Sequence, residues 1–436
     1  MKFPRSAKAA ACALAATALV AGCSSSGSSS AASTANPNQK VTLTFWSWVP
    51  NMQNVVNVWN KSHPNIQIKF TEAAGGDAEL AKLLTAGKAK DMPDLAQIEY
   101  QSLPTMVSNN YLADISSYDD SLKSDYPAGL WSQVTLGTSA LYGVPQDAAP
   151  LAFFYRTDIF KKYNLAVPTT WAQYATEAAA LHKADPSIYM GDTVTTDAGL
   201  FAGLTQQAGA QWWSASGSSW SVGIDSAASQ KVASYWGNLV QTGAIDSQAA
   251  WNASWNKSFS SGEYASWISA VWAPGDLASS AVNTKGQWAM AELPQWTAGQ
   301  HVSGAWGGSA TSVTADSKYP QQAAQFIAWL NQSAQGTALL ASQGSVYPAS
   351  LAAESSSSLP AQTFMGQSDF YTLAKQYSSQ VVAATWGPDV PVAYSKFSDA
   401  FASTVKTQSG YLAGLTAMQT AVVADMKSTG FTVSGS

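Results

Sequence analysis

The first folded part of the chain alternates strand and helix patterns, and this alternation restricts it to few architectures. Residues 41–45 and 66–70 alternate apolar and polar side chains with a period of two, as half-buried strands do. Residues 50–62 between them have a helical pattern, and a second helical stretch over 77–90 leads to a third strand at 94–98. Strands that alternate with helices predict a parallel sheet, and ligands of such sheets bind beyond the carboxyl ends of the strands.

The amino-terminal segment has the pattern of an export signal. Basic residues precede an apolar run over 9–20, and the small residues Ala21 and Gly22 follow it. The apolar run, about a dozen residues long, is too short to span a bilayer as a permanent helix. The segment that ends at Cys23 resembles the lipobox of bacterial lipoproteins. That resemblance implies cleavage of the signal 1–22 and attachment of a diacylglyceryl group to the Cys23 thiol.

Residues 23–40, which begin with Cys23, are rich in Ser and Ala and predict a flexible linker that holds a folded body away from a membrane. Two acyl chains anchor a protein stably where one does not. We therefore expect a lipid-anchored protein on the outer face of a bacterial cell membrane. The alternative is an ordinary secretory signal with an unrelated cysteine, which would give a freely secreted protein.

The composition excludes several classes of function. Removing the three basic residues of the signal from the 22 Lys and Arg leaves 19, against 27 Asp and Glu, so the exported chain is expected to be acidic. A nucleic-acid partner is not expected, because phosphates require basic patches. The only cysteine besides Cys23 is Cys12, inside the signal, so the exported body has no disulfide and no cysteine metal site.

Tryptophan is unusually abundant, with 18 residues in the chain. Much of this aromatic surface must belong to the core. Indole rings that remain exposed in a cleft, however, suit the flat apolar face of a pyranose, whose hydroxyls reach polar groups at the rim. The composition thus favours a sugar as the ligand.

Four blocks of residues, taken in order along the chain, form a recognisable pattern. They are 142–147 with 151–160 and 167–171; 262–272; 304–308 with 317–330 and 347–349; and 388–394 with a helical tail over 411–426. Together they resemble the extracytoplasmic carbohydrate-binding proteins of ABC importers, the maltose-binding-protein-like family 1 solute-binding proteins. Two departures are Arg156, where those proteins usually have Asn, and Ala265-Ser266, which replaces their Ala-Met pair.

The resemblance implies a periplasmic-binding-protein-like fold, with two α/β lobes joined by a hinge and a ligand cleft between them. We expect lobe one at 41–146 and 305–355, and lobe two at 147–304 and 356–436. The implied function is capture of a sugar, in particular an oligosaccharide, for delivery to an ABC permease in the membrane. A polyol or a glycerophosphodiester is an alternative ligand, and a surface glycosidase is an alternative function.

Four candidate ligand-binding residues lie at or beyond the ends of the first three strands. Trp46 and Trp48 flank Ser47 where the first strand leaves the sheet, so one of them is expected to face the cleft; alternatively, both pack in the core. Asp77 follows two glycines that let the backbone approach a ligand, and its other possible role is to cap a helix. Glu99 either accepts hydrogen bonds from sugar hydroxyls or is a solvated loop carboxylate.

The resemblance supplies further candidates. Asp147 lies at the expected hinge, where relatives place a polar residue that contacts the ligand or stabilises the hinge. Trp272 and Trp306 match motif positions that line the cleft in relatives, and Trp386 is a third candidate for stacking on a sugar. The pair Trp212-Trp213 either closes over a ligand or folds down as a plug of its own loop.

Catalysis is not expected. A glycosidase needs two carboxylates that face each other across a cleft, and Asp77, Glu99 and Asp147 are the available candidates. No HExxH, GxSxG or GxxxxGK[ST] motif occurs, and the three histidines are widely scattered. We therefore expect a monomeric binding protein without metal or cofactor, whose transporter takes its ATPase from a separate chain.

Overall fold

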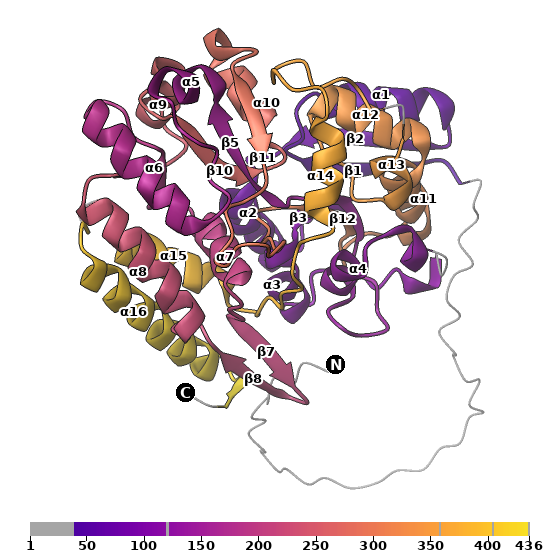
Figure 1. The fold of residues 1–436 in the computed structure, drawn as a ribbon. Coiled ribbons are helices and arrows are strands. Elements are labelled where there is room, and N and C mark those ends of the chain that lie inside the picture. Colours follow the sequence, from indigo (N-terminus) through magenta and orange to yellow (C-terminus); the bar gives the residue numbers. More distant parts are fainter. Residues whose placement is uncertain (1–38, 119–121, 357–358, 403–404, 435–436) are drawn as a thin grey trace, which may run out of the picture.

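Two halves make up the molecule, one with helices around a single sheet and the other with helices around three small sheets (Figure 1). The structure is a computed structural model that describes residues 39–118, 122–356, 359–402 and 405–434. Cys23, the expected signal and most of the expected linker lie outside the described residues. In the part of the chain that is described, no helix is long and apolar enough to cross a membrane.

A five-stranded sheet forms the first half. Its strand order is β2-β1-β3-β12-β4, and its strands are β1 (Val41–Ser47), β2 (Ile66–Glu72), β3 (Leu95–Glu99), β4 (Val144–Asp147) and β12 (Ser309–Val313). β1 pairs in parallel with β2 and β3, as the sequence pattern predicts. β12 runs antiparallel to both β3 and β4, so the expectation of a parallel sheet holds only for the first three strands.

Helices surround this sheet (Figure 1). They are α1 (Met52–Ser62), α2 (Gly76–Ala89), α3 (Leu103–Ser108), α4 (Ala128–Thr135), α11 (Pro320–Gln332), α12 (Ala334–Gly344) and α13 (Leu351–Glu354), with the short 3-10 turns η1 (Tyr100–Ser102), η2 (Ser116–Tyr118) and η3 (Leu122–Asp125). The helices expected at 50–62 and 77–90 are confirmed as α1 and α2, with starts shifted by one or two residues.

The second half contains three small sheets. Their strands are β5 (Leu151–Arg156), β10 (Ser266–Ala270) and β11 (Trp288–Ala291), all antiparallel; β6 (Asp192–Val194) and β9 (Asp246–Gln248), a parallel pair; and β7 (Trp213–Ser216), β8 (Ser219–Val222) and β13 (Thr432–Val433). The helices are α5 (Thr157–Tyr163), α6 (Trp171–Ala184), α7 (Ala198–Gln207), α8 (Ala227–Gln241), α9 (Ala253–Ser261), α10 (Ala273–Ser280), η4 (Val282–Thr284), α14 (Phe370–Ser378), α15 (Val390–Ala400) and α16 (Gln408–Ser428). α16 confirms the expected helical tail.

The buried apolar residues form two separate cores, which define two lobes. One core takes its buried residues from 41–144 and 310–349, and the other takes them from 148–306 and 347–426. The chain therefore passes between the lobes three times. The lobe boundaries expected from the sequence stay a prediction, and both Trp306 and Tyr347 pack in the second core.

The three crossing segments lie side by side. Asp147 pairs with Ser309 in β12 and forms an antiparallel bridge with Pro348. The Ala148 amide donates to the Tyr347 carbonyl at 3.0 Å, and the Trp306 amide donates to the Ala149 carbonyl at 3.1 Å. Backbone hydrogen bonds thus tie the crossings to one another.

Strand β1 shows how its alternating pattern positions the first lobe. Leu43 lies in the core and is 0% exposed, whereas the preceding Thr42 faces solvent. Successive side chains of a strand point to opposite faces, so the sequence alone fixes which face is buried.

We predict that Leu43→Ala destabilises the first lobe by about 2–5 kcal/mol, because it removes buried methyl groups and leaves a cavity. The matched change Thr42→Ala, one residue away on the exposed face, should cost less than about 1 kcal/mol. Urea unfolding of the two variants measures the difference. Equal losses of stability would contradict the assignment of the two faces.

Candidate functional site

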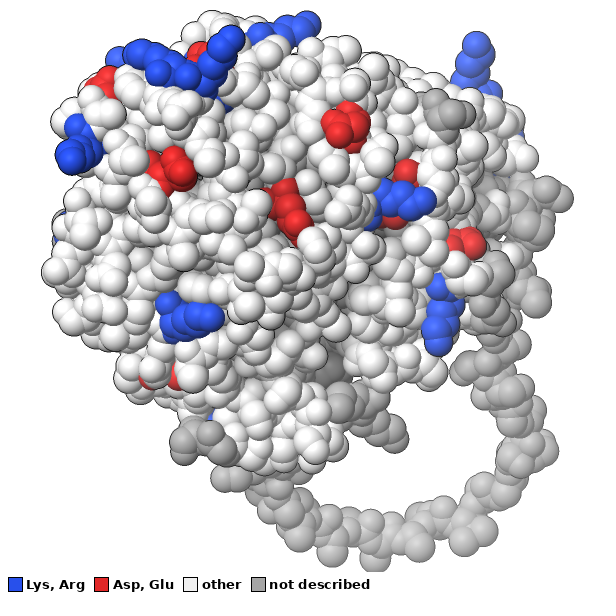
Figure 2. All heavy atoms as spheres, in the orientation of Figure 1, with Lys and Arg blue, Asp and Glu red and all other residues white. Residues whose placement is uncertain are grey.

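Four carboxylates meet where the two lobes face each other. Asp77 comes from the first turn of α2, Glu99 from the end of β3, and Asp147 from the end of β4, all in the first lobe. Asp197 comes from the second lobe, immediately before α7. The carboxylates of Asp77, Asp147 and Asp197 all raise the pKa of Glu99. Charged side chains are sparse on the face of the molecule shown in Figure 2.

Glu99 is the centre of the group. Burial, followed by the charges of Asp77, Asp197 and Asp147, raises its pKa to about 8. Its Oε2 accepts a hydrogen bond of 2.7 Å from Gln101 Nε2. Burial and the neighbouring carboxylates therefore favour the protonated form of Glu99 in this arrangement. The alternative of a solvated loop carboxylate does not fit this burial.

Asp77 is the exposed member of the four carboxylates. The residue is exposed as a whole, but the surrounding protein and the charge of Asp197 raise the pKa of its carboxyl to about 6. The N-cap of α2 is Gly75, and no side chain makes a capping hydrogen bond there. The role of Asp77 as a helix cap, which the sequence left open, is therefore not observed.

Asp147 belongs to the first crossing between the lobes. The Ser309 hydroxyl donates to its Oδ1, and its main-chain carbonyl accepts a hydrogen bond of 3.0 Å from the Tyr100 hydroxyl. Burial raises its pKa to about 6, against the lowering effect of the hydrogen bonds from Ser309. Its contacts hold the crossing in place, and its charge also reaches Glu99.

Asp197 is a site residue that the sequence analysis missed. It is the N-cap of α7, and its Oδ1 accepts a hydrogen bond of 2.9 Å from the Gly199 amide. It also accepts hydrogen bonds from two indoles, at 2.9 Å from Trp251 Nε1 and 3.1 Å from Trp306 Nε1. Its position just before a helix is a capping signal in the sequence, but that signal alone does not indicate a ligand site.

The indoles that hold Asp197 belong to a tryptophan cluster of the second lobe. We use this name for Trp251, Trp255, Trp267, Trp272 and Trp306. The ring centroids of Trp272 and Trp306 are 4.9 Å apart in an edge-on arrangement, and Trp251 lies 6.1 and 5.9 Å from them. Trp272 Nε1 donates to the Trp306 carbonyl at 3.0 Å. The cluster brings both motif tryptophans to the carboxylates.

Trp251 is the exposed member of the tryptophan cluster and was also missed. It is 49% exposed, whereas Trp306 is 5% exposed. Its backbone φ of 62° lies in the left-handed region, which is unfavourable for a bulky residue and is held here by its surroundings. No family motif marks this position, so only its residue type could have suggested it.

Tyr394, on α15, contributes a buried hydroxyl. The residue is 6% exposed, and its hydroxyl has no hydrogen-bond partner in the part of the chain that is described. Burial, followed by the charges of Asp77, Glu99 and Asp197, raises its pKa well above the usual value. A buried phenol without a partner is costly, which makes this hydroxyl a candidate ligand contact.

The other three tryptophans that the sequence predicts as ligand contacts lie outside the tryptophan cluster. Trp48 packs on Gly75, where an added Cβ would lie 3.1 Å from Trp48 Cγ, so it stands at the start of α2 near Asp77. Trp46 instead lies under Lys82, whose Nζ is 4.3 Å from the ring centroid, and packs on the first core. Trp386 packs against Trp213 at 6.2 Å between ring centroids. Their roles in ligand binding stay predictions.

Trp212-Trp213 form a plug of the second lobe and do not close over a cleft. The two residues are 5% and 0% exposed, respectively. Trp212 Nε1 donates to the Ser229 hydroxyl at 3.2 Å. Of the two roles that the sequence left open for this pair, the buried plug is the one observed, and both rings pack in the second core.

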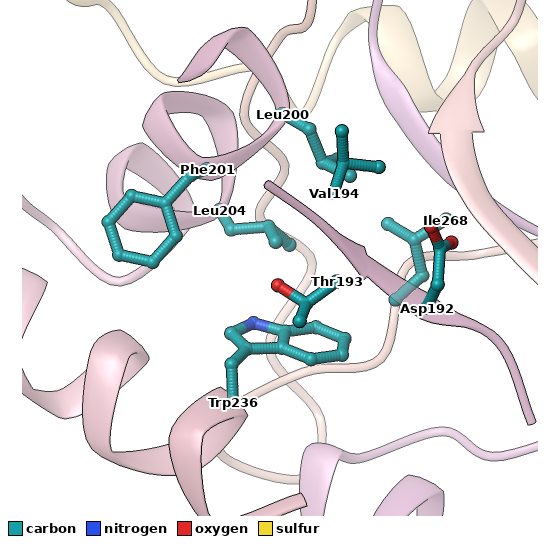
Figure 3. Close-up of a pocket in the computed structure, with 8 residues that line it drawn as sticks. All are labelled: Asp192, Thr193, Val194, Leu200, Phe201, Leu204, Trp236 and Ile268. Atoms are coloured by element: carbon teal, nitrogen blue, oxygen red, sulfur yellow. The ribbon is translucent and has the colours of Figure 1, made fainter. Parts of the chain in front are cut away.

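A small cavity in the second lobe is separate from the site between the lobes. Its walls come from β6, α7, α8 and β10, and they include Trp236, Leu204 and the Thr193 side chain (Figure 3). Its volume is about 10 Å³, room for about one water molecule. It cannot hold a sugar ring. Among the described residues, no group of three or more His, Cys, Asp or Glu is arranged to hold a metal ion.

Comparison with known proteins identifies the family. The family model of the bacterial extracellular solute-binding proteins matches residues 35–337. The chain belongs to this family. The expected membership in the family 1 solute-binding proteins of ABC importers is therefore confirmed. The two-lobed α/β fold is confirmed as well.

Individual members of the solute-binding family are distant in sequence but close in fold. The arabinooligosaccharide-binding protein of Bacillus subtilis is 24% identical over 311 residues, which cover 67% of this chain and 70% of that protein. The galacto-N-biose-/lacto-N-biose I-binding protein of the ABC transporter from Bifidobacterium longum, in complex with lacto-N-biose, superposes with a TM-score of 0.82 at 27% identity, covering 92% of this chain and 100% of that chain. A binding protein from B. animalis subsp. lactis, in complex with β-1,6-galactobiose, superposes with a TM-score of 0.81 at 25% identity, covering 91% of this chain and 100% of that chain.

We predict that acid closes this solute-binding protein in the absence of ligand. Burial and neighbouring carboxylates raise the pKa of Glu99 to about 8 and that of Asp77 to about 6 when the lobes lie together as in this structure, so a form with the lobes together binds more protons than an open form with hydrated carboxylates. The closed form therefore gains stability as the pH falls from about 8 to about 5.5. Small-angle X-ray scattering should show a smaller radius of gyration at the lower pH.

Glu99→Gln is the matching control for this pH effect. It keeps the shape of the side chain and removes its titration, so most of the change in radius of gyration should disappear. A radius that stays constant or grows on acidification of the unmodified protein would contradict the prediction.

Proposed function

We propose that this protein captures an oligosaccharide outside the cell between its two lobes and delivers it to an ABC permease. The observation that carries the proposal is a hydrogen bond from the exposed Trp251, in the tryptophan cluster of the second lobe, to Asp197. The charge of Asp197 in turn acts on Glu99 of the first lobe. An indole face stacks on the apolar face of a pyranose, and carboxylates accept hydrogen bonds from its hydroxyls. The named ligands of the relatives are sugars, which supports the same class here.

Closure around the ligand is the proposed mechanism. Hydrogen bonds join the lobes in this structure: the Thr105 hydroxyl donates to the Pro388 carbonyl at 2.9 Å, and Gln133 Nε2 donates to the Ala384 carbonyl at 3.1 Å. A sugar that touches both lobes binds the closed form better than the open one and shifts the population toward it. The permease then recognises the closed surface.

The alternatives are less well supported by the site. A glycerophosphodiester carries a negative charge, which the neighbouring Asp carboxylates would repel. A neutral polyol lacks the flat ring face that a tryptophan platform suits. A glycosidase would use the same carboxylates for hydrolysis, but the family consists of binding proteins, so we propose binding without turnover.

A thermal-shift screen against mono-, di- and trisaccharides tests this function, because a ligand that binds only the folded state raises its melting temperature. A rise of several degrees for one group of sugars, without release of reducing ends, supports a binding protein. Release of reducing sugar would instead favour the glycosidase. If no sugar raised the melting temperature, this result would contradict the proposal.

We predict that Trp251→Ala weakens binding of the sugar that scores in the screen by about ten-fold or more, because exposed aromatic anchors carry much of the binding energy. The side chain is 49% exposed, so its removal should leave the fold intact. Isothermal titration calorimetry measures the affinity. The control is Tyr118→Ala, another large aromatic with 41% exposure, which lies on η2, outside the tryptophan cluster. Equal affinities of the two variants would argue against Trp251 as the platform.

We also propose that the protein is a monomer, anchored by lipid at Cys23 to the outer face of the cell membrane after removal of its signal peptide. Cys23→Ser is then expected to release the protein from the membrane fraction and to abolish labelling with a fatty acid. Cys12→Ser, the only other cysteine change that the chain offers, should leave both unchanged. Persistence of Cys23→Ser in the membrane fraction would contradict the lipid anchor.

A further inference from the structure

We propose that Gly199 is a positioning residue for sugar binding. The space left by its missing side chain lets Trp306 reach Asp197, and Asp197 in turn fixes the orientation of Trp251. This inference rests on the proposed function, because it concerns the aromatic surface on which the sugar is proposed to stack. It assigns control over the affinity to a residue that has no side chain of its own.

The first turn of α7 has no room for a side chain at its second residue, Gly199, which is buried. A Cβ built there would lie 2.7 Å from Trp306 Cδ1, 2.8 Å from Trp306 Nε1 and 3.0 Å from Asp197 Oδ1. Non-bonded carbon atoms are best separated by about 3.5–4.0 Å, so an added methyl group overlaps the ring. It would press on both atoms of the 3.1 Å hydrogen bond from Trp306 Nε1 to Asp197 Oδ1.

The close contact continues along α7. One turn further on, a Cβ at Gly203 would lie 2.5 Å from the Ala305 carbonyl oxygen, and a Cβ at Gly304 would lie 1.9 Å from the Gly203 carbonyl oxygen. The Ala305 amide also donates to Gln206 Oε1 at 3.3 Å. Glycine is less favourable than alanine inside a helix, so these glycines have a packing reason. The segment 304–306, which leads to the crossing between the lobes, therefore lies directly against the backbone of α7.

Trp306 is fixed from its other sides as well. The residue is 5% exposed, and its ring centroid lies 4.9 Å from that of Trp272. Its amide donates to the Ala149 carbonyl at 3.1 Å, and its carbonyl accepts a hydrogen bond of 3.0 Å from Trp272 Nε1. Because protein interiors are close-packed, this ring has little room to move. A methyl group at position 199 would therefore displace the Asp197 carboxylate.

Trp251 depends on that carboxylate. Its Nε1 donates to Asp197 Oδ2 at 2.9 Å, and the residue is 49% exposed. Its backbone φ of 62° is unfavourable for a bulky side chain and persists only because the surroundings hold it. Displacement of Asp197 would release the indole from its orientation. A stacking surface that must be ordered when the ligand binds lowers the affinity.

Gly199→Ala measures this effect. In isothermal titration calorimetry with the sugar that raises the melting temperature most, its dissociation constant should be at least about five-fold higher than that of the unmodified protein, the scale of one hydrogen bond. Gly129→Ala is the matched control, because Gly129 is also the second residue of its helix, α4, and a Cβ there would meet no atom within 4 Å. It should change the dissociation constant by less than about two-fold.

A double-mutant cycle shows whether Gly199 acts through Trp251. Trp251→Phe keeps an aromatic face but has no N–H group to donate to Asp197. In this background, Gly199→Ala should weaken binding further by less than about two-fold, because the hydrogen bond that it disturbs is already absent. A general disturbance of the fold would lower the affinity by the same factor in both backgrounds and would overturn the proposal.

Asp197→Asn is a second variant that leaves the packing at Gly199 unchanged. Asparagine is also a good N-cap residue, so α7 should keep its start. Its amide nitrogen donates and does not accept, so the side chain cannot keep all the hydrogen bonds of the carboxylate. It should weaken binding in the unmodified background and by less than about two-fold in the Trp251→Phe background. Unchanged affinity, or equal losses in both backgrounds, would overturn the proposal.

A crystal structure of Gly199→Ala without ligand separates this inference from the proposed function. It should show Trp251 Nε1 beyond hydrogen-bond distance of Asp197. If both indole hydrogen bonds to Asp197 stayed in place, the positioning role would be overturned, whether or not a sugar binds. If no sugar raised the melting temperature of the unmodified protein, the proposed function would fail, and the crystal structure would still decide the role of Gly199.

Discussion

The contact between Asp197 and two indoles is the interaction on which the site depends. Trp251 and Trp306 both donate to this carboxylate, so one side chain orients the exposed ring and a buried ring of the tryptophan cluster. The same carboxylate raises the pKa of Glu99 and Asp77 across the boundary between the lobes. Asp197 thus couples the aromatic surface of one lobe to the acidic surface of the other, and any change in lobe closure alters both.

The fold places these groups together through strand ends and helix starts. Glu99 and Asp147 end two strands that pair with β12 on opposite sides, which brings both to one edge of the sheet. Asp77 and Asp197 stand at the starts of α2 and α7, where unpaired backbone N–H groups favour negative charge. Backbone hydrogen bonds join the three crossings between the lobes to one another.

The sequence predicts much of this arrangement because periodicity and strand order are local properties. The first helices and strands, the two-lobed fold and the family are confirmed. Strand ends pointed to Asp77 and Glu99, and motif positions pointed to Trp272 and Trp306. Asp197, Trp251 and Tyr394 were missed because they approach the site only through tertiary packing. The ligand-binding roles of Trp46 and Trp386 stay predictions, and an alternating pattern does not reveal that Lys82 lies over one ring and that Trp213 packs against the other.

A crystal structure of the complex with the sugar that raises the melting temperature most tests the account directly. The account predicts one sugar ring stacked on Trp251, with polar groups of the same ring within hydrogen-bond distance of Glu99 and Asp197 and with both lobes in contact with the ligand. A sugar bound to one lobe alone, or bound away from the tryptophan cluster, would contradict the claim that the ligand is held between that cluster and the carboxylates.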